Sequence, residues 1–496
     1  MDEEQKLERG LGLVEATSLN MTFMVGIGPF VVIPFVIQAM GGGALSLLAW
    51  AAGAALAACD GCIWAELGAA MPQAGGSYVF LREAYGPARW GRLLSFLFIW
   101  QTLFQGPLSI ASGALGFAQY AGFLVGRSGW LAAMLRPLGP HAEHVMAAGV
   151  IVLVVFLLYR RITEIGRISL VFSVLVIATI LWVIWGGAGH FLAGGARRLL
   201  DFSGIDRSLS SLLLVGLGHG TVQTIYSYLG YYNVCNLGAE MKNPERNIPR
   251  AIFISIVGIT VLYLGMQASI LSVIPWREAQ GSSFIVSTFI ERAYGGRWAD
   301  LATALILVTA LGSVFSATLG YSRVPYAAAL DGNFFSGFAR VHRTKHFPHI
   351  SLLALGAAAM LFSLFFSLFS VIRAILAMRC IIQFVGQAVG LVLLHQRSAF
   401  AEKHASADKW ASADAPATGR GAANAEGHAT AGKRLPFRMW LYPLPVVLAI
   451  AGWLWIFIST GEKPMLASLA AAGAGILVYL TRARLARQWP FEERAS

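Results

Sequence analysis

Long stretches without a charged residue recur along the whole chain. The longest extends from Ala16 to Cys59 with no Asp, Glu, Lys or Arg, and ten further runs follow it. An α-helix of about 20 apolar residues crosses the roughly 30 Å hydrocarbon core of a bilayer. Because the first run is long enough for two crossings, the pattern predicts twelve membrane-spanning helices. The further runs cover residues 93–126, 145–159, 168–189, 208–239, 251–276, 301–322, 350–372, 380–394, 439–461 and 464–481.

Two of these runs are too short to cross a membrane alone. The run 145–159 must begin upstream, near His144, and the run 380–394 must take in Arg373 and Arg379. Arginine has a long apolar stem, which lets its charged group reach the membrane interface from a buried position. We therefore expect both arginines to point toward the membrane surface.

The composition strengthens the membrane interpretation. Of the 496 residues, 57% are hydrophobic and only 12% are charged, about half the charged share of an ordinary soluble domain. A water-soluble protein of this size needs a more polar surface. The composition excludes a nucleic-acid-binding domain, a soluble enzyme and a disordered scaffold, and indicates an all-α polytopic membrane protein.

The net charge of +12 is distributed unevenly along the chain. With the N-terminus placed inside, the inside segments hold 26 of the 37 Lys and Arg residues. The positive-inside rule then predicts that both termini are cytoplasmic, in the plasma (inner) membrane. This orientation gives a cytoplasmic N-tail at 1–12 and a cytoplasmic C-tail at 483–496. Residues 396–438, rich in Ala, Gly and Ser, are predicted to be a disordered cytoplasmic loop between helices ten and eleven.

Two predicted spans contain residues that interrupt a helix. In the first span the interruption is Gly26-Ile27-Gly28-Pro29, halfway along the helix. Glycine permits a non-helical turn, and proline, which has no N–H, suits the start of a renewed helix. We expect one half-helix to end near Val25 and another to begin at Pro29. A simple proline kink with tight packing is the alternative.

The sixth span has a polar and aromatic centre, from Tyr226 to Asn233, preceded by glycines. A lipid-facing helix has no use for four tyrosines and an asparagine at this depth, so the segment should face protein or a watery cavity. Helices one and six also hold corresponding positions in two halves of five helices each, at 13–190 and 208–395. Paired breaks in corresponding helices indicate the binding site of a secondary transporter.

Two such breaks together form a receptor for a zwitterion. Free N–H groups at the start of a half-helix attract a carboxylate. The carbonyl groups of Met24, Val25 and Tyr226 suit an ammonium group, so an α-amino acid needs no charged side chain to hold it. The predicted substrate-binding residues are Met24, Val25, Gly26, Ile27, Gly28, Tyr226, Ser227, Tyr228, Gly230, Tyr231 and Tyr232.

Three further residues are candidates for gating or ion coupling. Asp60 lies well inside the second predicted helix, and an acid within the membrane is costly unless it is paired or used. Asp60 has either a structural role or a role in a proton or amine pathway, and the sequence leaves both open. Ser313 and Ser316, in the eighth helix, could place hydroxyl groups near carbonyls of the first break and so hold Na⁺, although hydroxyls also bond to their own helix. Coupling to H⁺ or Na⁺ therefore stays open.

Six motifs occur in a characteristic order along most of the chain. In this order the sequence resembles the amino acid-polyamine-organocation (APC) permeases, which share the LeuT-type inverted-repeat fold. The motifs lie at residues 26–30, 65–68 with 72–78, 83–87, 242–252, 322–326 with 331–332, and 436–438 with 441–445.

The resemblance implies alternating-access transport of an amino acid or related amine. It also implies a 5+5 inverted repeat followed by two further helices at 439–482, with helices one and six discontinuous. Tyr226 falls where the family keeps an aromatic gate over the substrate. Two positions depart from the family pattern: Ile27 stands where many relatives have a small polar residue, and Val176 stands where some members carry a lysine that replaces sodium.

Transport of a neutral α-amino acid is the predicted function. A polyamine or cationic amino-acid transporter is the alternative, supported mainly by Asp60, and a non-transporting amino-acid sensor of the same fold is a further one. We expect no enzymatic activity, because the spans lack paired acids or a nucleophile with a base. No cofactor, metal site or nucleic-acid partner is expected. The expected partners are a small-molecule substrate and the lipid bilayer, and the sequence identifies no protein partner.

Overall fold

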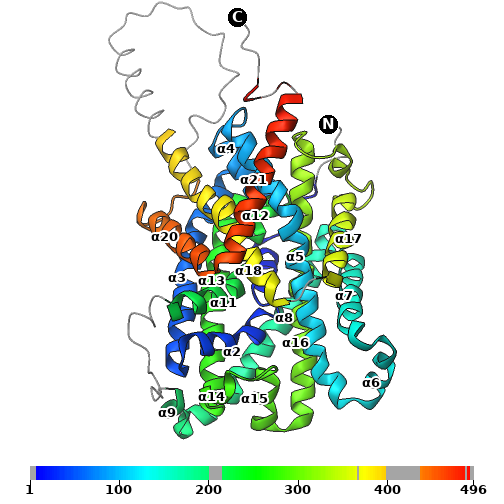
Figure 1. Cartoon of the computed structure of the whole chain (residues 1–496), viewed down its shortest axis with the longest axis vertical. Helices are drawn as coiled ribbons and strands as arrows, with labels where there is room; N and C mark the ends of the chain where they lie inside the picture. Colours follow the sequence, from blue (N-terminus) through cyan, green and yellow to red (C-terminus); the bar gives the residue numbers. More distant parts are fainter. Residues whose placement is uncertain are drawn as a thin grey trace, which may run out of the picture.

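The regular secondary structure is helical in a computed structural model that describes residues 7–199, 215–365, 368–397, 436–485, 487 and 489–491. The helices form an elongated bundle in which most long helices run along the longest axis (Figure 1). In the described part of the chain, extended pairing is limited to two isolated bridges. The predicted loop at 396–438 lies almost entirely outside the described residues.

Seven helices are long and apolar enough to cross a membrane, and the bent pair α1 and α2 adds an eighth span. Three shorter apolar helices, of 10–17 residues, accompany them. The protein is therefore an integral membrane protein. The long helices are α3 (Gly43–Ala70), α5 (Trp90–Arg127), α8 (Ile162–His190), α13 (Pro244–Val273), α16 (Gly296–Leu330), the stretch Ile372–Arg397 and α21 (Glu462–Leu485), and the shorter ones are α7 (Ala142–Leu158), α17 (His349–Phe365) and α20 (Leu444–Ser459).

The first span is interrupted where the sequence predicts it. Helix α1 (Leu13–Met24) and helix α2 (Gly28–Met40) meet at an angle of 46°. Pro29 is the second residue of α2, where its missing N–H leaves no helical hydrogen bond unmade. The predicted break of helix one is confirmed.

The sixth span is interrupted as well. Helix α11 (Leu217–Tyr228) ends one residue before Leu229, and the short helix α12 (Asn233–Asn236) follows. Between them Gly230 adopts φ +128°, and a Cβ atom there would lie 2.9 Å from the backbone nitrogen of Met24. Only glycine allows this turn to pass so close to the end of α1. The two breaks are therefore in direct contact.

Shorter elements connect these helices. Helix α4 (Ser77–Ala84) precedes α5, and α15 (Ile285–Tyr294) precedes α16. The start of the chain and the end of α21 lie at the same end of the bundle (Figure 1). The remaining connecting elements are α6 (Gly129–Leu135), η2 (Arg136–His141), η3 (Phe191–Gly195), α9 (Ala196–Leu199), η5 (Gly238–Glu240), α14 (Trp276–Ala279) and η6 (Ser336–Ala339).

The two spans expected to extend beyond their charge-free runs both do so, and the tenth, Ile372–Arg397, takes in Arg373 and Arg379. Helix α7 begins at Ala142, so the expected upstream start near His144 is confirmed. Helix α18 (Leu368–Arg379) continues as a π-helical turn, η7 (Cys380–Val385). The expectation that Arg379 reaches the interface is wrong, because its side chain is 1% exposed and lies inside the bundle. Arg373, two turns earlier, is exposed.

Candidate functional site

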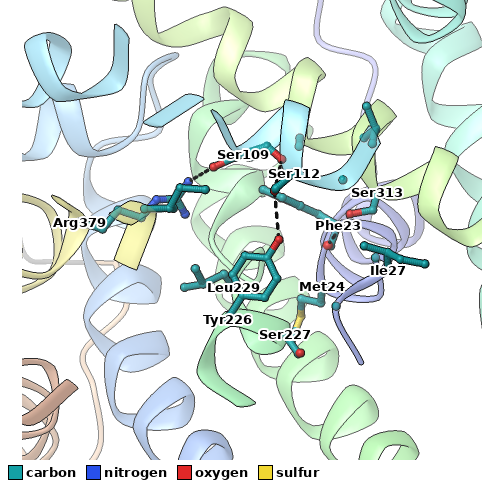
Figure 2. Close-up of a pocket in the computed structure, with 16 residues that line it drawn as sticks. Phe23, Met24, Ile27, Ser109, Ser112, Tyr226, Ser227, Leu229, Ser313 and Arg379 are labelled. Carbon is teal, nitrogen blue, oxygen red and sulfur yellow. Dashed lines mark hydrogen bonds between the residues drawn. The ribbon is translucent and has the colours of Figure 1, made fainter. Parts of the chain in front are cut away.

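A small cavity lies at the meeting point of the two broken helices (Figure 2). Its volume is about 50 Å³, room for a few water molecules. Helices α5, α16 and α18 complete its wall. The lining residues are Phe23, Met24, Gly26, Ile27, Gly28, Ser109, Ser112, Gly113, Tyr226, Ser227, Leu229, Ser313, Val314, Ala317, Ile375 and Arg379.

The first break contributes backbone N–H groups to this wall. Val25 still donates its N–H to the Met21 carbonyl, but the N–H groups of Gly26 and Ile27 form no hydrogen bond within the described residues. They lie just before the N-terminus of α2, the end of a helix that carries positive partial charge. Free amides at such a terminus form an anion-binding site. The Ile27 side chain turns toward α5, because a Cβ atom on Gly116 would lie 2.3 Å from its Cγ2.

The second break contributes a free hydroxyl. Ser227 is buried, and its Oγ has no hydrogen-bond partner in the part of the chain that the structure describes. This side chain faces the first break, since a Cβ atom on Gly28 would lie 3.1 Å from Ser227 Oγ. An unpaired buried hydroxyl is costly unless a ligand pairs with it. A polar ligand at this point would therefore find two amides and one hydroxyl without competing partners.

Part of the carbonyl receptor expected from the sequence is already occupied. The hydroxyl of Tyr263, on α13, donates to the Met24 carbonyl at 2.8 Å and also lies 3.1 Å from the Ser227 carbonyl. One side chain thus joins the two interrupted helices. Sequence reasoning missed Tyr263, which stands alone in an apolar run. Val25 does not line the cavity.

Tyr226 occupies the middle of the cavity wall. Its hydroxyl forms a 3.1 Å hydrogen bond with Ser112 of α5, and its ring is only partly buried. Figure 2 shows this ring between Arg379 on one side and the residues of the first break on the other. The role of Tyr226 as an aromatic gate over a ligand stays a prediction.

Ser313 and Ser316 of α16, the two serines that are candidates for ion coupling, both contact α1. Ser313 Oγ donates to the Phe23 carbonyl at 3.1 Å, and Ser316 Oγ donates to the Leu19 carbonyl at 2.6 Å. Asn233 donates to Ser316 Oγ at 3.1 Å, so α12 joins the same contact. Only Ser313 lines the cavity.

Three tyrosines of the predicted site lie behind the cavity rather than in its lining. Tyr228 packs against Trp50, with ring centres 6.0 Å apart. Tyr231 donates a hydrogen bond to Asp60, which is 1% exposed and also lies near the indole N–H groups of Trp64 and Trp453. Tyr232 stacks on Trp64 at 4.5 Å. Asp60 is thus linked to the second break through the hydroxyl of Tyr231. Gly230, another predicted site residue, lies in the turn of that break.

Arg379 is the lining residue that sequence reasoning placed elsewhere. Its guanidinium donates to Gln105 Oε1 at 3.1 Å, to Ser109 Oγ at 2.8 Å and to the hydroxyls of Tyr232 and Tyr321. All four partners are uncharged. Arg379 lies inside the apolar stretch Ile372–Arg397 rather than at its end, and this charge was the available signal.

A second buried arginine lies toward the end of the bundle where the chain starts. Arg323 of α16 forms a two-point ion pair with Glu240, at 2.9 and 2.6 Å, and both side chains are at most 1% exposed. The carbonyl of Glu240 accepts hydrogen bonds from the N–H groups of Gly10 and Leu11. This contact joins α16, η5 and the N-terminal segment.

Comparison with known proteins places this architecture among transporters. The sequence profile of the amino acid permease family matches residues 11–398. The human cationic amino acid transporter 4 is 25% identical over 79% of this chain, and the match covers 60% of that longer protein. The serine/threonine exchanger SteT of Bacillus subtilis is 25% identical over 73% of this chain and 78% of its own length. The human cystine/glutamate transporter is 26% identical over 80% and 75%, respectively.

The profile match covers both broken helices and every element of the cavity wall. It also covers all the helices and loops that supply predicted site residues. The family is one of permeases rather than enzymes. The chain belongs to the amino acid permease family, within the amino acid-polyamine-organocation superfamily.

Proposed function

We propose that this protein is a secondary active transporter that moves an α-amino acid across the membrane by alternating access. The observation that carries the proposal is the set of unpaired groups at the two breaks. The N–H groups of Gly26 and Ile27 and the hydroxyl of Ser227 converge on one cavity without protein partners. Such a set suits the carboxylate of a zwitterion.

The finer architecture belongs to this proposal. The bent pair α1 and α2 and the interrupted α11 and α12 count as one span each, and with the other apolar helices they give twelve. We assign helices one to five to a first repeat at 13–190 and helices six to ten to an inverted second repeat at 208–395. Both termini lie in the cytoplasm and the protein resides in the plasma (inner) membrane.

The nature of the substrate side chain follows from the charge in the cavity wall. The curated relatives are named for cationic amino acids, for serine and threonine, and for cystine and glutamate. A cationic side chain would meet the guanidinium of Arg379 inside a medium that screens charge poorly. We therefore place the polyamine and cationic alternative last. A substrate with a neutral side chain, as expected from the sequence, avoids this repulsion by Arg379. A substrate with an acidic side chain avoids it as well.

Ion coupling is proposed at two places. Protonation of Asp60 would change its contact with Tyr231, next to the turn at Gly230. Sodium would instead bind where Ser313 and Ser316 face the carbonyls of α1. The two proposals differ in the gradient that drives accumulation.

Uptake into proteoliposomes tests the proposal. The purified protein should accumulate at least one radiolabelled α-amino acid from a panel, under an imposed pH or sodium gradient. Gly26→Val should abolish uptake, because a Cβ atom at Gly26 would lie 2.5 Å from Ser313 Oγ. Gly122→Ala is the control, since its Cβ atom would meet open space.

The outcomes separate the candidate functions. Normal uptake by Gly26→Val would count against a site at the breaks. Saturable binding of an amino acid without counterflow would favour a non-transporting sensor of the same fold. Failure of every amino acid to bind or move would refute the proposed function.

A further inference from the structure

Arg379 is the one feature of the cavity wall that binding of a plain zwitterion does not use. Its side chain is 1% exposed, and it belongs to the residues that line the cavity at the broken helices. Its four hydrogen-bond partners are Gln105, Ser109 and the hydroxyls of two tyrosines, all uncharged. Within the described residues no acidic side chain forms an ion pair with it.

Arg323, which is also buried, provides a comparison because its guanidinium has an acidic partner. Arg323 has Glu240 as a two-point partner, with both charges enclosed together. Asp60 forms no ion pair with Arg379 and accepts a hydrogen bond from Tyr231, although both charged groups lie near Tyr231 and Tyr232. A charge removed from water is retained when something compensates it. Among the described residues Arg379 has no direct ion-pair partner, and a ligand carboxylate in the cavity would supply one.

The geometry gives the cavity two separate places for negative charge. One is the pair of free amides at Gly26 and Ile27, beside the N-terminus of α2. The other is the guanidinium, which enters the cavity wall from α18 on the far side of Tyr226 (Figure 2). One carboxylate would satisfy one of these places and leave the other unused. A substrate with two carboxylates satisfies both.

We infer that the substrate is an amino acid with an acidic side chain, of the aspartate and glutamate class, whose side-chain carboxylate binds Arg379. This inference rests on the proposed function and narrows it. A planar guanidinium binds a carboxylate through two parallel hydrogen bonds, which gives both affinity and orientation. One amide oxygen and three hydroxyls now hold the guanidinium in place, and a carboxylate offers it stronger, charge-assisted bonds.

Pairs of substrates that differ in charge and hardly in shape provide the first test. Unlabelled glutamate and glutamine, and aspartate and asparagine, compete for uptake into proteoliposomes against whichever labelled amino acid the protein transports. The acid of each pair should compete at least about tenfold better than its amide, as expected for loss of a hydrogen-bonded charge. Equal competition by acid and amide would overturn the inference while leaving amino-acid transport intact.

Two variants of the same helix region provide the second test. Arg379→Gln should remove the preference for acid over amide, measured as the ratio of their competition, and Arg379→Lys should retain part of that ratio. Arg373→Gln is the matched control, because Arg373 is exposed and does not line the cavity. If Arg379→Gln lowers uptake of glutamate and glutamine by the same factor, the arginine serves the fold and the inference fails.

The wild-type comparison does not depend on either variant folding. If no amino acid is taken up at all, the proposed function fails, and that result is distinct from equal uptake of glutamate and glutamine. Each outcome thus bears on one of the two proposals.

Discussion

The hydroxyl of Tyr263 lies 2.8 Å from the carbonyl oxygen of Met24, the last residue of α1. The same hydroxyl lies 3.1 Å from the carbonyl oxygen of Ser227, on the other interrupted helix. A carbonyl at a helix end has lost its partner within the helix and must find another when it is buried. Tyr263 meets this need for both breaks at once, so their relative position depends on a side chain of α13.

Tyr263→Phe should therefore destabilise the protein and reduce transport together. Leaving a buried carbonyl without a partner costs about 1–3 kcal/mol. Thermal unfolding of the purified protein and uptake into proteoliposomes measure the two effects. Tyr294→Phe is the control, because Tyr294 is 40% exposed. Unchanged unfolding and uptake in Tyr263→Phe would show that the breaks hold their arrangement without this contact.

Gly230→Ala should lower the thermal stability of the protein by more than its positive φ angle alone explains. A non-glycine residue in this region of φ carries roughly 1–3 kcal/mol of strain. At Gly230 the added Cβ atom would also lie 2.9 Å from the backbone nitrogen of Met24. Gly461→Ala is the comparison, since Gly461 has φ +95° and open space around it. Equal losses of thermal stability in the two variants would mean that the contact between the breaks is unimportant.

Asp60→Asn should separate exchange from accumulation if this acid carries the coupling proton. Asparagine keeps the shape and still accepts a hydrogen bond from Tyr231, but it cannot take up a proton at the carboxyl group. We expect counterflow of substrate to persist and accumulation driven by a pH gradient to disappear. Asp331→Asn, which removes a surface acid paired with Arg82, should leave both unchanged. Accumulation by Asp60→Asn at the wild-type level would assign the coupling elsewhere.

Removal of one partner of the Glu240–Arg323 pair should be strongly destabilising. Breaking a buried ion pair in this way costs about 3–5 kcal/mol, because one charge is left buried and uncompensated. Glu240→Gln and Arg323→Met should each lower the unfolding temperature in detergent, and the double variant should recover part of the loss. A loss in the double variant equal to the sum of the two single losses would argue against a coupled pair.

The sequence predicts the breaks well because they depend on local chemistry. Gly26, Gly28 and Pro29 disfavour a continuous helix wherever they occur together, and the structure interrupts α1 and α2 at these residues. Around Gly230 the same applies, since its φ angle is one that glycine adopts freely. The sequence likewise predicts a membrane protein, because the long runs without charged residues can be read directly from it.

The sequence does not predict which side chains face one another across helices. Arg379 was expected at the interface because a count of apolar residues places it at the edge of a run. Its burial depends on how α18 is rotated against α5 and α11, which no local pattern encodes. Tyr263 was missed for the same reason, since a lone tyrosine in an apolar helix has no signature until its neighbours are known. The binding roles of the residues around the cavity stay predictions.

The π-helical turn η7 would allow α18 to rotate and change the direction of the Arg379 side chain without unfolding. Such a turn holds one residue more than an α-helical turn. If the surplus residue moves along the helix, the segment that it passes rotates by about 100°. Arg379 is the last residue before this turn. Travel of the bulge across that position would turn the guanidinium away from the cavity wall and back, so that the pairing of Arg379 with a ligand would depend on where the surplus residue lies.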